Sequence, residues 1–288
     1  LESYTYQSSQ VSAEFIDPEK NPLRAKAAEI TSLGTILVEY KDRTERVTSS
    51  NEQDLTNALI KAITGETRKV YFTQGHGEKD TDSSDRSGYS AIAQALTTDN
   101  YGVEKIVLAQ AGAVPDDATV LVIAGPRTDF FQPEIDAINA YVDRGGKVMA
   151  LLDPPPGDGT STTPLLDGFL QQWGFNLGRN IVVDASGIGQ ILGTDASVPV
   201  AANYPPHPMT ENFQLMTAFL MARSIEASDQ GGGRVPQVVV QTGAQSWAEA
   251  EMAAIGKGDG RVELNEDRGD RPGPISLGAA VSAPAANP

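Results

Sequence analysis

Between residues 69 and 183 the chain repeats one short apolar run followed by one amphipathic segment, and this alternation constrains the fold more than any other feature. The most apolar run is TVLVIA at residues 119–124, which has no polar side chain after its first residue. Strands that are apolar on both faces are typical of parallel sheets covered by helices on both sides. We therefore predict an α/β domain built on a parallel sheet.

The spacing of apolar residues gives the approximate bounds of these elements. Short apolar runs predict strands at residues 70–72, 103–108, 119–124, 147–152 and 180–183. Helical spacing predicts helices around residues 89–96, after Pro133 and at 165–173. Beyond Gly187, glycine and proline are frequent, and only residues 213–222 are typical of a helix and 238–241 of a strand.

The first 66 residues show a different order of elements. Residues 11–17 alternate like a strand, and a helix is expected after the prolines that follow. Residues 35–48 predict a β-hairpin with a tight polar turn. Ser50 and Gln53 form the pattern of a capping box, ahead of a helix that ends near Gly65.

This order of strand, helix, hairpin and helix is thioredoxin-like. The chain contains no cysteine, so the unit cannot exchange dithiols, and we interpret it as a packing or docking module. We predict two domains: a small thioredoxin-like α/β domain at residues 1–66 and a larger parallel-sheet domain at residues 67–288.

Composition argues against several functional classes. The chain has 38 acidic and 22 basic residues, and its formal charge of −16 repels nucleic-acid phosphates. The absence of cysteine removes thiolate nucleophiles, cysteine zinc sites and iron–sulfur clusters. No Gly-x-Ser-x-Gly elbow is present for acyl transfer. We expect a non-enzymatic protein with no cofactor, no metal and no nucleic-acid partner.

Three loops follow predicted parallel strands, and the carboxyl ends of such strands share the sheet edge where α/β domains bind ligands. On a functional interpretation, His76 is an acid–base group or ligand that Asp153 orients. On a structural interpretation, two glycines permit a tight turn and His76 bonds to backbone. The candidate residues of this ligand or partner edge are Gly75, His76, Gly77, Pro126, Arg127 and Asp153.

Four other motifs have simpler structural explanations. The acidic turn at residues 80–85 lacks the glycine and the distal glutamate of a calcium loop. Residues 187–193 imitate a dinucleotide fingerprint, but no convincing helix follows them. His207 is better explained by capping of a following helix, and Trp247 by packing than by a binding platform.

A set of stretches also occurs in a recognisable order over most of the chain. They are EFIDPEKNP (14–22), GTILVEY (34–40), NEQDLTNALIKAI (51–63), VYFTQGHGE (70–78), VLVIAGP (120–126), INAYVDRGGKVMALLDP (138–154), HPMT (207–210) and SWAE (246–249). Together they resemble the extracytoplasmic part of the GldG-like auxiliary subunits of ABC transporters, known from gliding-motility systems.

The resemblance implies a parent protein anchored by membrane helices outside this chain, acting beside an ATPase and a permease on the periplasmic side of the inner membrane. It also implies a flavodoxin-like, class-I-amidotransferase-like central domain, related to a domain of intraflagellar-transport proteins. The amidotransferase cysteine has no counterpart here, so no catalytic residue carries over. The family's late strand ending in Gly-Asp-Ser-Asp-Phe does not follow residues 273–284, so we expect this domain to be truncated at its C-terminus.

Three hypotheses follow. The leading one is a non-enzymatic recognition or scaffolding domain of an ABC transport complex, which holds a protein or glycan outside the membrane. The second is a hydrolase or carbohydrate-active domain that uses His76 and nearby carboxylates. The third is a small-molecule binding domain in the same cleft.

Overall fold

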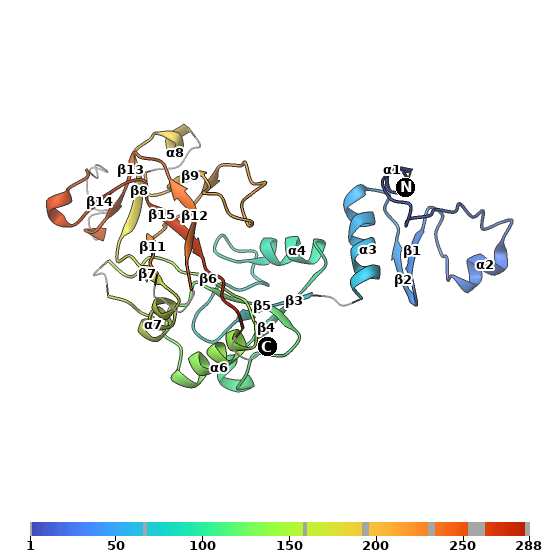
Figure 1. Cartoon of the computed structure of the whole chain (residues 1–288), viewed down its shortest axis with the longest axis horizontal. Coiled ribbons are helices and arrows are strands. Elements are labelled where there is room, and N and C mark those ends of the chain that lie inside the picture. Colours follow the sequence, from blue (N-terminus) through green and yellow to red (C-terminus); the bar gives the residue numbers. More distant parts are fainter. Residues whose placement is uncertain are drawn as a thin grey trace. The chain divides into compact units, whose positions relative to one another are not determined.

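The computed structural model describes residues 2–65, 68–157, 160–191, 196–229, 234–252 and 263–285. The chain divides into two compact units, Leu1–Thr67 and Arg68–Pro288. Figure 1 labels the helices and strands of both units.

The N-terminal unit consists of three helices and one hairpin. The predicted hairpin is confirmed: β1 and β2 pair antiparallel from Ile36↔Val47 to Tyr40↔Arg43, so the turn has only two residues. The strand predicted at residues 11–17 is wrong, because this segment is irregular, mostly exposed, and pairs with no described strand. The thioredoxin-like layout therefore stays a prediction. The elements are α1 (Glu2–Gln7), α2 (Pro22–Ala27), β1 (Ile36–Tyr40), β2 (Arg43–Val47) and α3 (Glu52–Thr64).

Helix α3 is capped one residue later than the sequence pattern indicated. The Asn51 side chain, not that of Ser50, accepts a hydrogen bond from the backbone N–H of Asp54 at 2.8 Å. The helix ends at Gly65, as predicted, where a φ of +74° places the residue in the left-handed region that glycine tolerates best.

We predict that Asn51→Ala destabilises α3 by about 1 kcal/mol, because the first turn loses a side-chain acceptor for an orphan N–H. Hydrogen exchange of the α3 amides in the whole chain measures this local opening, and a roughly fivefold faster exchange is expected. Ser50→Ala is the matched control and should leave exchange unchanged. A larger effect for Ser50→Ala than for Asn51→Ala would contradict the observed cap.

The second unit is organised around a four-stranded parallel sheet in the order β4-β3-β5-β6. Numbered along this unit, that order is 2-1-3-4, the order of flavodoxin-like sheets, and it confirms the predicted α/β fold class. Connections leave β3 and β5 in opposite directions, so the sheet edge between them is the topological switch point. The strands are β3 (Arg68–Thr73), β4 (Tyr101–Ile106), β5 (Ala118–Ala124) and β6 (Val148–Leu151).

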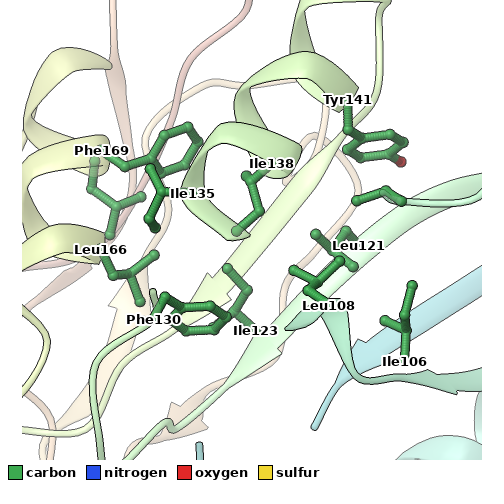
Figure 2. Packing of buried hydrophobic residues seen from close by; sticks show 12 residues of the cluster. Ile106, Leu108, Leu121, Ile123, Phe130, Ile135, Ile138, Tyr141, Leu166 and Phe169 are labelled. Atoms are coloured by element: carbon green, nitrogen blue, oxygen red, sulfur yellow. The ribbon is translucent and has the colours of Figure 1, made fainter. Parts of the chain in front are cut away.

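Helices cover both faces of this sheet, and the side chains of β5 alternate between them. Leu121 and Ile123 pack in the larger core, against α6 and α7, while Val122 and Ala124 belong to the cluster on the α4 side. Figure 2 shows Leu121 and Ile123 on the strand beneath Ile138 of α6. The helices are α4 (Ser90–Thr98), α5 (Leu108–Ala111), α6 (Gln132–Asp143) and α7 (Pro164–Gln172), so Leu108 begins a helix and does not end a strand.

The C-terminal half of this unit is built from antiparallel sheets. They have the orders β10-β9-β12-β15, β14-β13-β8 and β11-β7. In Figure 1 the strands β8, β13 and β14 lie far from β3, β4 and β5 of the same unit. The elements are β7 (Phe175–Leu177), β8 (Ile181–Asp184), α8 (Ile188–Ile191), β9 (Val200–Asn203), β10 (Thr217–Ala218), β11 (Ile225–Ala227), β12 (Gln237–Thr242), β13 (Ser246–Glu249), η2 (Glu266–Arg268), β14 (Arg271–Pro272) and β15 (Ser276–Ala280).

The helix predicted at residues 213–222 is wrong. The segment forms turns and the short strand β10, which pairs antiparallel with β9 through Thr217↔Ala201. Leu215 and Leu220 point to solvent at 70% and 63% exposure, so they do not form the buried face that would stabilise a helix here. None of the helices in the described part of the chain is long and apolar enough to span a membrane.

Candidate functional site

The loops after β3, β5 and β6 meet at the carboxyl edge of the parallel sheet. The carbonyl of His76 accepts hydrogen bonds from the backbone N–H groups of Arg127 and Thr128, at 2.7 and 3.1 Å. The ammonium of Lys79 in the first loop pairs with Asp153 in the third at 3.0 Å. The structure therefore brings all three predicted loops together at one edge.

Gly77 is required for this close approach. Its φ is +81°, and a Cβ at this position would lie 3.2 Å from Cβ of Arg127. Any other residue would strain the backbone at this φ, and Arg127 would have to shift by a few tenths of an ångström. Gly75 has a φ of +120°, so both glycines beside His76 adopt conformations that other residues rarely take.

His76 is buried, at 6% exposure, between two buried glutamates. Its Nε2 lies 3.0 Å from Oε2 of Glu134 on α6. Its Nδ1 lies 3.5 Å from Oε1 of Glu78, too far for a hydrogen bond, and both atoms lack another partner. The imidazole stacks on Phe130, with ring centroids 4.2 Å apart. We call His76, Glu78, Glu134 and Phe130 the His76 cluster.

Both glutamates also hold backbone in place. Oε2 of Glu78 accepts the backbone N–H of His76 at 2.7 Å, and Oε2 of Glu134 accepts that of Phe131 at 2.8 Å. Glu134 is the third residue of α6, the position from which a carboxylate reaches back to the helix start. The two carboxylates approach opposite nitrogens of the imidazole, so the cluster has no common point for a metal ion.

Asp153 does not orient His76, contrary to the functional interpretation of the sequence. Its side chain is 61% exposed and pairs with Lys79. Glu78 and Glu134 surround the imidazole in its place, and sequence reasoning missed both. A glutamate three residues into a predicted helix was the available signal for Glu134.

A cavity of about 300 Å³ opens beside the cluster, beyond the ends of β5 and β6. His76 is not among its lining residues. Arg127 and Arg223 line it, and Arg223 is buried at 8% exposure. Burial lowers the pKa of Arg223; nearby Asp167 acts in the opposite direction, and Arg179 acts in the same direction as burial. The full lining is Pro126, Arg127, Leu152, Asp153, Pro154, Pro155, Pro156, Ser161, Thr162, Thr163 and Arg223.

The remaining candidates are explained by local contacts. Asp80 and Asp82 both pair with Lys105, which holds the pKa of Asp80 below its usual range. In the described parts of the chain no three His, Asp or Glu side chains gather as metal ligands. Trp247 is buried in β13 at 6% exposure and donates to Glu249, so it is not an open platform.

The last two sequence motifs are His207 and the glycine-rich stretch at residues 187–193. Nδ1 of His207 accepts the backbone N–H of Met209 in a turn, and the helix it was expected to cap does not form. Part of the fingerprint at residues 187–193 lies outside the described residues.

Two solved structures are similar to the chain over part of its length. One is the N-terminal domain of mmIFT52, with 13% identity and a TM-score of 0.49, covering 62% of this chain and 78% of that one. The other is a putative ThuA-like protein from Bacteroides uniformis, with 12% identity and a TM-score of 0.41, covering 71% and 74%. Neither similarity carries a functional conclusion.

No curated protein matches the chain significantly. The model of one protein family, described as an ABC-type uncharacterized transport system, matches residues 67–286. This match includes the parallel sheet, the His76 cluster and the cavity. Because it spans most of the sequence, the chain belongs to this family of auxiliary components of ABC-type transport systems.

Proposed function

We propose that the chain is a non-enzymatic recognition and scaffolding part of an ABC transport complex, located on the periplasmic side of the inner membrane. Family membership gives it an accessory role in transport. The ordered motifs shared with GldG-like subunits support the finer assignment to a gliding-motility type of system. Burial of the His76 ring and its absence from the cavity lining argue against chemistry at that residue.

The observation that carries this proposal is an exposed apolar surface on residues 209–221, which we call the apolar segment. It contains three methionines and two leucines at the surface, although it lies in turns beside the short strand β10. Gathered apolar groups of this kind mark interaction sites, and flexible methionines adapt to a partner's shape. Its exposed large side chains are Met209, Phe213, Leu215, Met216, Leu220 and Met221.

The partner that best fits the apolar segment is the permease of the same transport system. Glu211 is its only charged residue, so the surface suits an apolar partner and not a charged one. A domain on the periplasmic side has no access to an ATPase on the cytoplasmic side, whereas the permease crosses the membrane and exposes surface there. The ATPase is then held in the complex through the permease.

The test is affinity purification of the tagged full-length protein from its native membrane, with mass spectrometry of the proteins recovered. We expect the permease and the ATPase with the unchanged protein. The double variant Leu215→Ser with Leu220→Ser should lower recovery of the permease at least tenfold. The melting temperature of this variant should equal that of the unchanged protein, because both side chains are exposed.

The matched control replaces two other exposed apolar residues of the same unit, as Met149→Ser with Val235→Ser. This variant should recover the permease normally. Absence of both transporter subunits from the unchanged protein would contradict the proposed function. Full recovery of the permease with the Leu215 and Leu220 variant would agree with the proposed function but would show that the apolar segment is not the contact.

A further inference from the structure

The cavity lies at the carboxyl ends of β5 and β6, on the same edge of the sheet as the switch point and next to it. Pro126 comes two residues after the end of β5, and Asp153 comes two residues after the end of β6. Ligands of open parallel sheets bind outside the carboxyl ends of the strands. The volume of about 300 Å³ matches the lower end of the range for small-molecule sites, about 300 to 1,000 Å³.

A buried cation without a carboxylate partner lines this cavity. Nε of Arg223 donates to the carbonyl of Gly178 at 2.8 Å, which fixes one side of the guanidinium. Within the described residues, no carboxylate lies within ion-pair distance of it. A guanidinium stays charged in proteins, and burying it unpaired is costly. An anion in the cavity would remove this cost.

The acidic groups around the cavity are already engaged. Asp153 pairs with Lys79 across the sheet edge. Asp167 accepts hydrogen bonds from the hydroxyls of Ser161 and Thr163 at 2.6 and 3.1 Å. Arg127, the second cation of the lining, also has no ion pair with a described residue. Asp167 keeps its negative charge but does not line the cavity, whereas the lining itself carries two arginines and one carboxylate, Asp153, which is already paired.

The first turn of α7 adds nothing to this charge. The backbone N–H groups of Leu165 and Leu166 have no partner within the helix, and both donate to the carboxylate of Asp129, at 2.8 and 3.3 Å. The attraction for an anion therefore comes from the two arginines and not from the helix end.

One part of the lining is apolar and stiff, because four prolines and Leu152 form it and proline fixes its own backbone φ. The other part carries the hydroxyl groups of Ser161, Thr162 and Thr163. The apolar part suits the carbon skeleton of a ligand, while the exposed hydroxyl of Thr162 offers a donor beside the arginines. An oxyanion carried on a small apolar group fits this lining better than a free inorganic ion does.

We propose that this cavity binds a small organic phosphate or carboxylate, with Arg127 and Arg223 as the groups that hold the oxyanion. Both side chains present the planar fork that matches phosphate and carboxylate oxygens. The inference goes beyond the accessory role in transport and does not depend on the contact with the permease. A ligand bound here lies outside the His76 cluster and needs no chemistry from it.

The test is titration calorimetry of the whole chain with phenyl phosphate, benzoate and inorganic phosphate. We expect phenyl phosphate or benzoate to bind with one-to-one stoichiometry, and inorganic phosphate to bind at least tenfold more weakly. Arg223→Gln and Arg127→Gln should each weaken binding at least tenfold. Arg86→Gln removes the same charge from an exposed site outside the cavity and should bind as the unchanged protein does.

Three results would overturn the proposal. The first is no binding of any of the three probes by the unchanged protein. The second is an equal loss of affinity in the Arg86→Gln and Arg127→Gln variants, which would indicate a general charge effect. The third is normal binding by Arg127→Gln. If Arg223→Gln does not fold, the exposed Arg127 still decides the question, because its side chain makes no hydrogen bond or ion pair with a described residue.

Discussion

Replacing Glu134 by alanine is expected to lower the free energy of unfolding of the 68–288 unit by about 1–3 kcal/mol, the cost of leaving buried polar groups without their partner. Glu134 is 2% exposed, and its Oε2 contacts both Nε2 of His76 and the backbone N–H of Phe131. The variant leaves the buried imidazole without its nearest carboxylate and the first turn of α6 without its acceptor. Removing one partner of a buried polar pair costs more than the pair contributes, because the remaining group stays desolvated.

Urea unfolding followed by tryptophan fluorescence measures this loss, since Trp173 and Trp247 both lie in this unit. Asp136→Ala is the control: it removes an exposed carboxylate from the same helix and should cost less than about 0.5 kcal/mol. A double-mutant cycle with His76→Ala should give a coupling energy of about 0.5–3 kcal/mol. Equal stabilities for the Glu134 and Asp136 variants would show that the cluster does not support the fold.

The same variant separates a structural from a chemical role of the His76 cluster. If the cluster only holds the loops together, Glu134→Ala lowers stability while the folded fraction keeps its affinity for phenyl phosphate. None of the cluster residues lines the cavity, and the bond that joins the two, from the backbone N–H of Arg127 to the carbonyl of His76, does not involve the Glu134 side chain.

Much of the parallel sheet could be predicted from the sequence, because its strands are defined by local patterns. TVLVIA at residues 119–124 is apolar on both faces, and helices pack on both faces of β5 in the structure. Glycine and proline mark most of the helix ends. The convergence of the three loops followed from the same pattern, since parallel strands end at one edge.

The wrong predictions concern segments whose structure depends on contacts with residues far away in the sequence. Residues 11–17 alternate like a strand, but no second strand pairs with them in the described chain. Residues 213–222 have apolar side chains at helical spacing, but these side chains face solvent, so burial does not stabilise a helix there. The partner of His76 was missed for a related reason: Glu134 is 58 positions away, and only the packing of α6 against the sheet edge brings it to the imidazole.

The carboxyl edge of the sheet therefore combines two features with different consequences. The His76 cluster fixes the first loop with buried groups, although Nδ1 of His76, Oε1 of Glu78 and Oε1 of Glu134 have no hydrogen-bond partner. The cavity beside it is lined by Arg127 and Arg223, which form no ion pair with a described residue. The proposed anion site therefore lies on loops that the His76 cluster holds through contacts of its own.

Phe130→Ala is expected to lower the free energy of unfolding of the same unit by about 3–5 kcal/mol, the usual cost of removing a buried phenyl ring. Phe130 is 2% exposed, belongs to the core under α6 and stacks on His76 at 4.2 Å. In Figure 2 its ring lies beside Ile123 and Leu166. The cavity left behind would border the imidazole, so water would reach His76 and its two glutamates.

The neighbouring Phe131→Ala is the control, since Phe131 is 65% exposed and its loss should cost less than about 1 kcal/mol. Urea unfolding by tryptophan fluorescence compares the two, and a cost below about 1 kcal/mol for Phe130→Ala would mean that the His76 cluster is not part of the folded core.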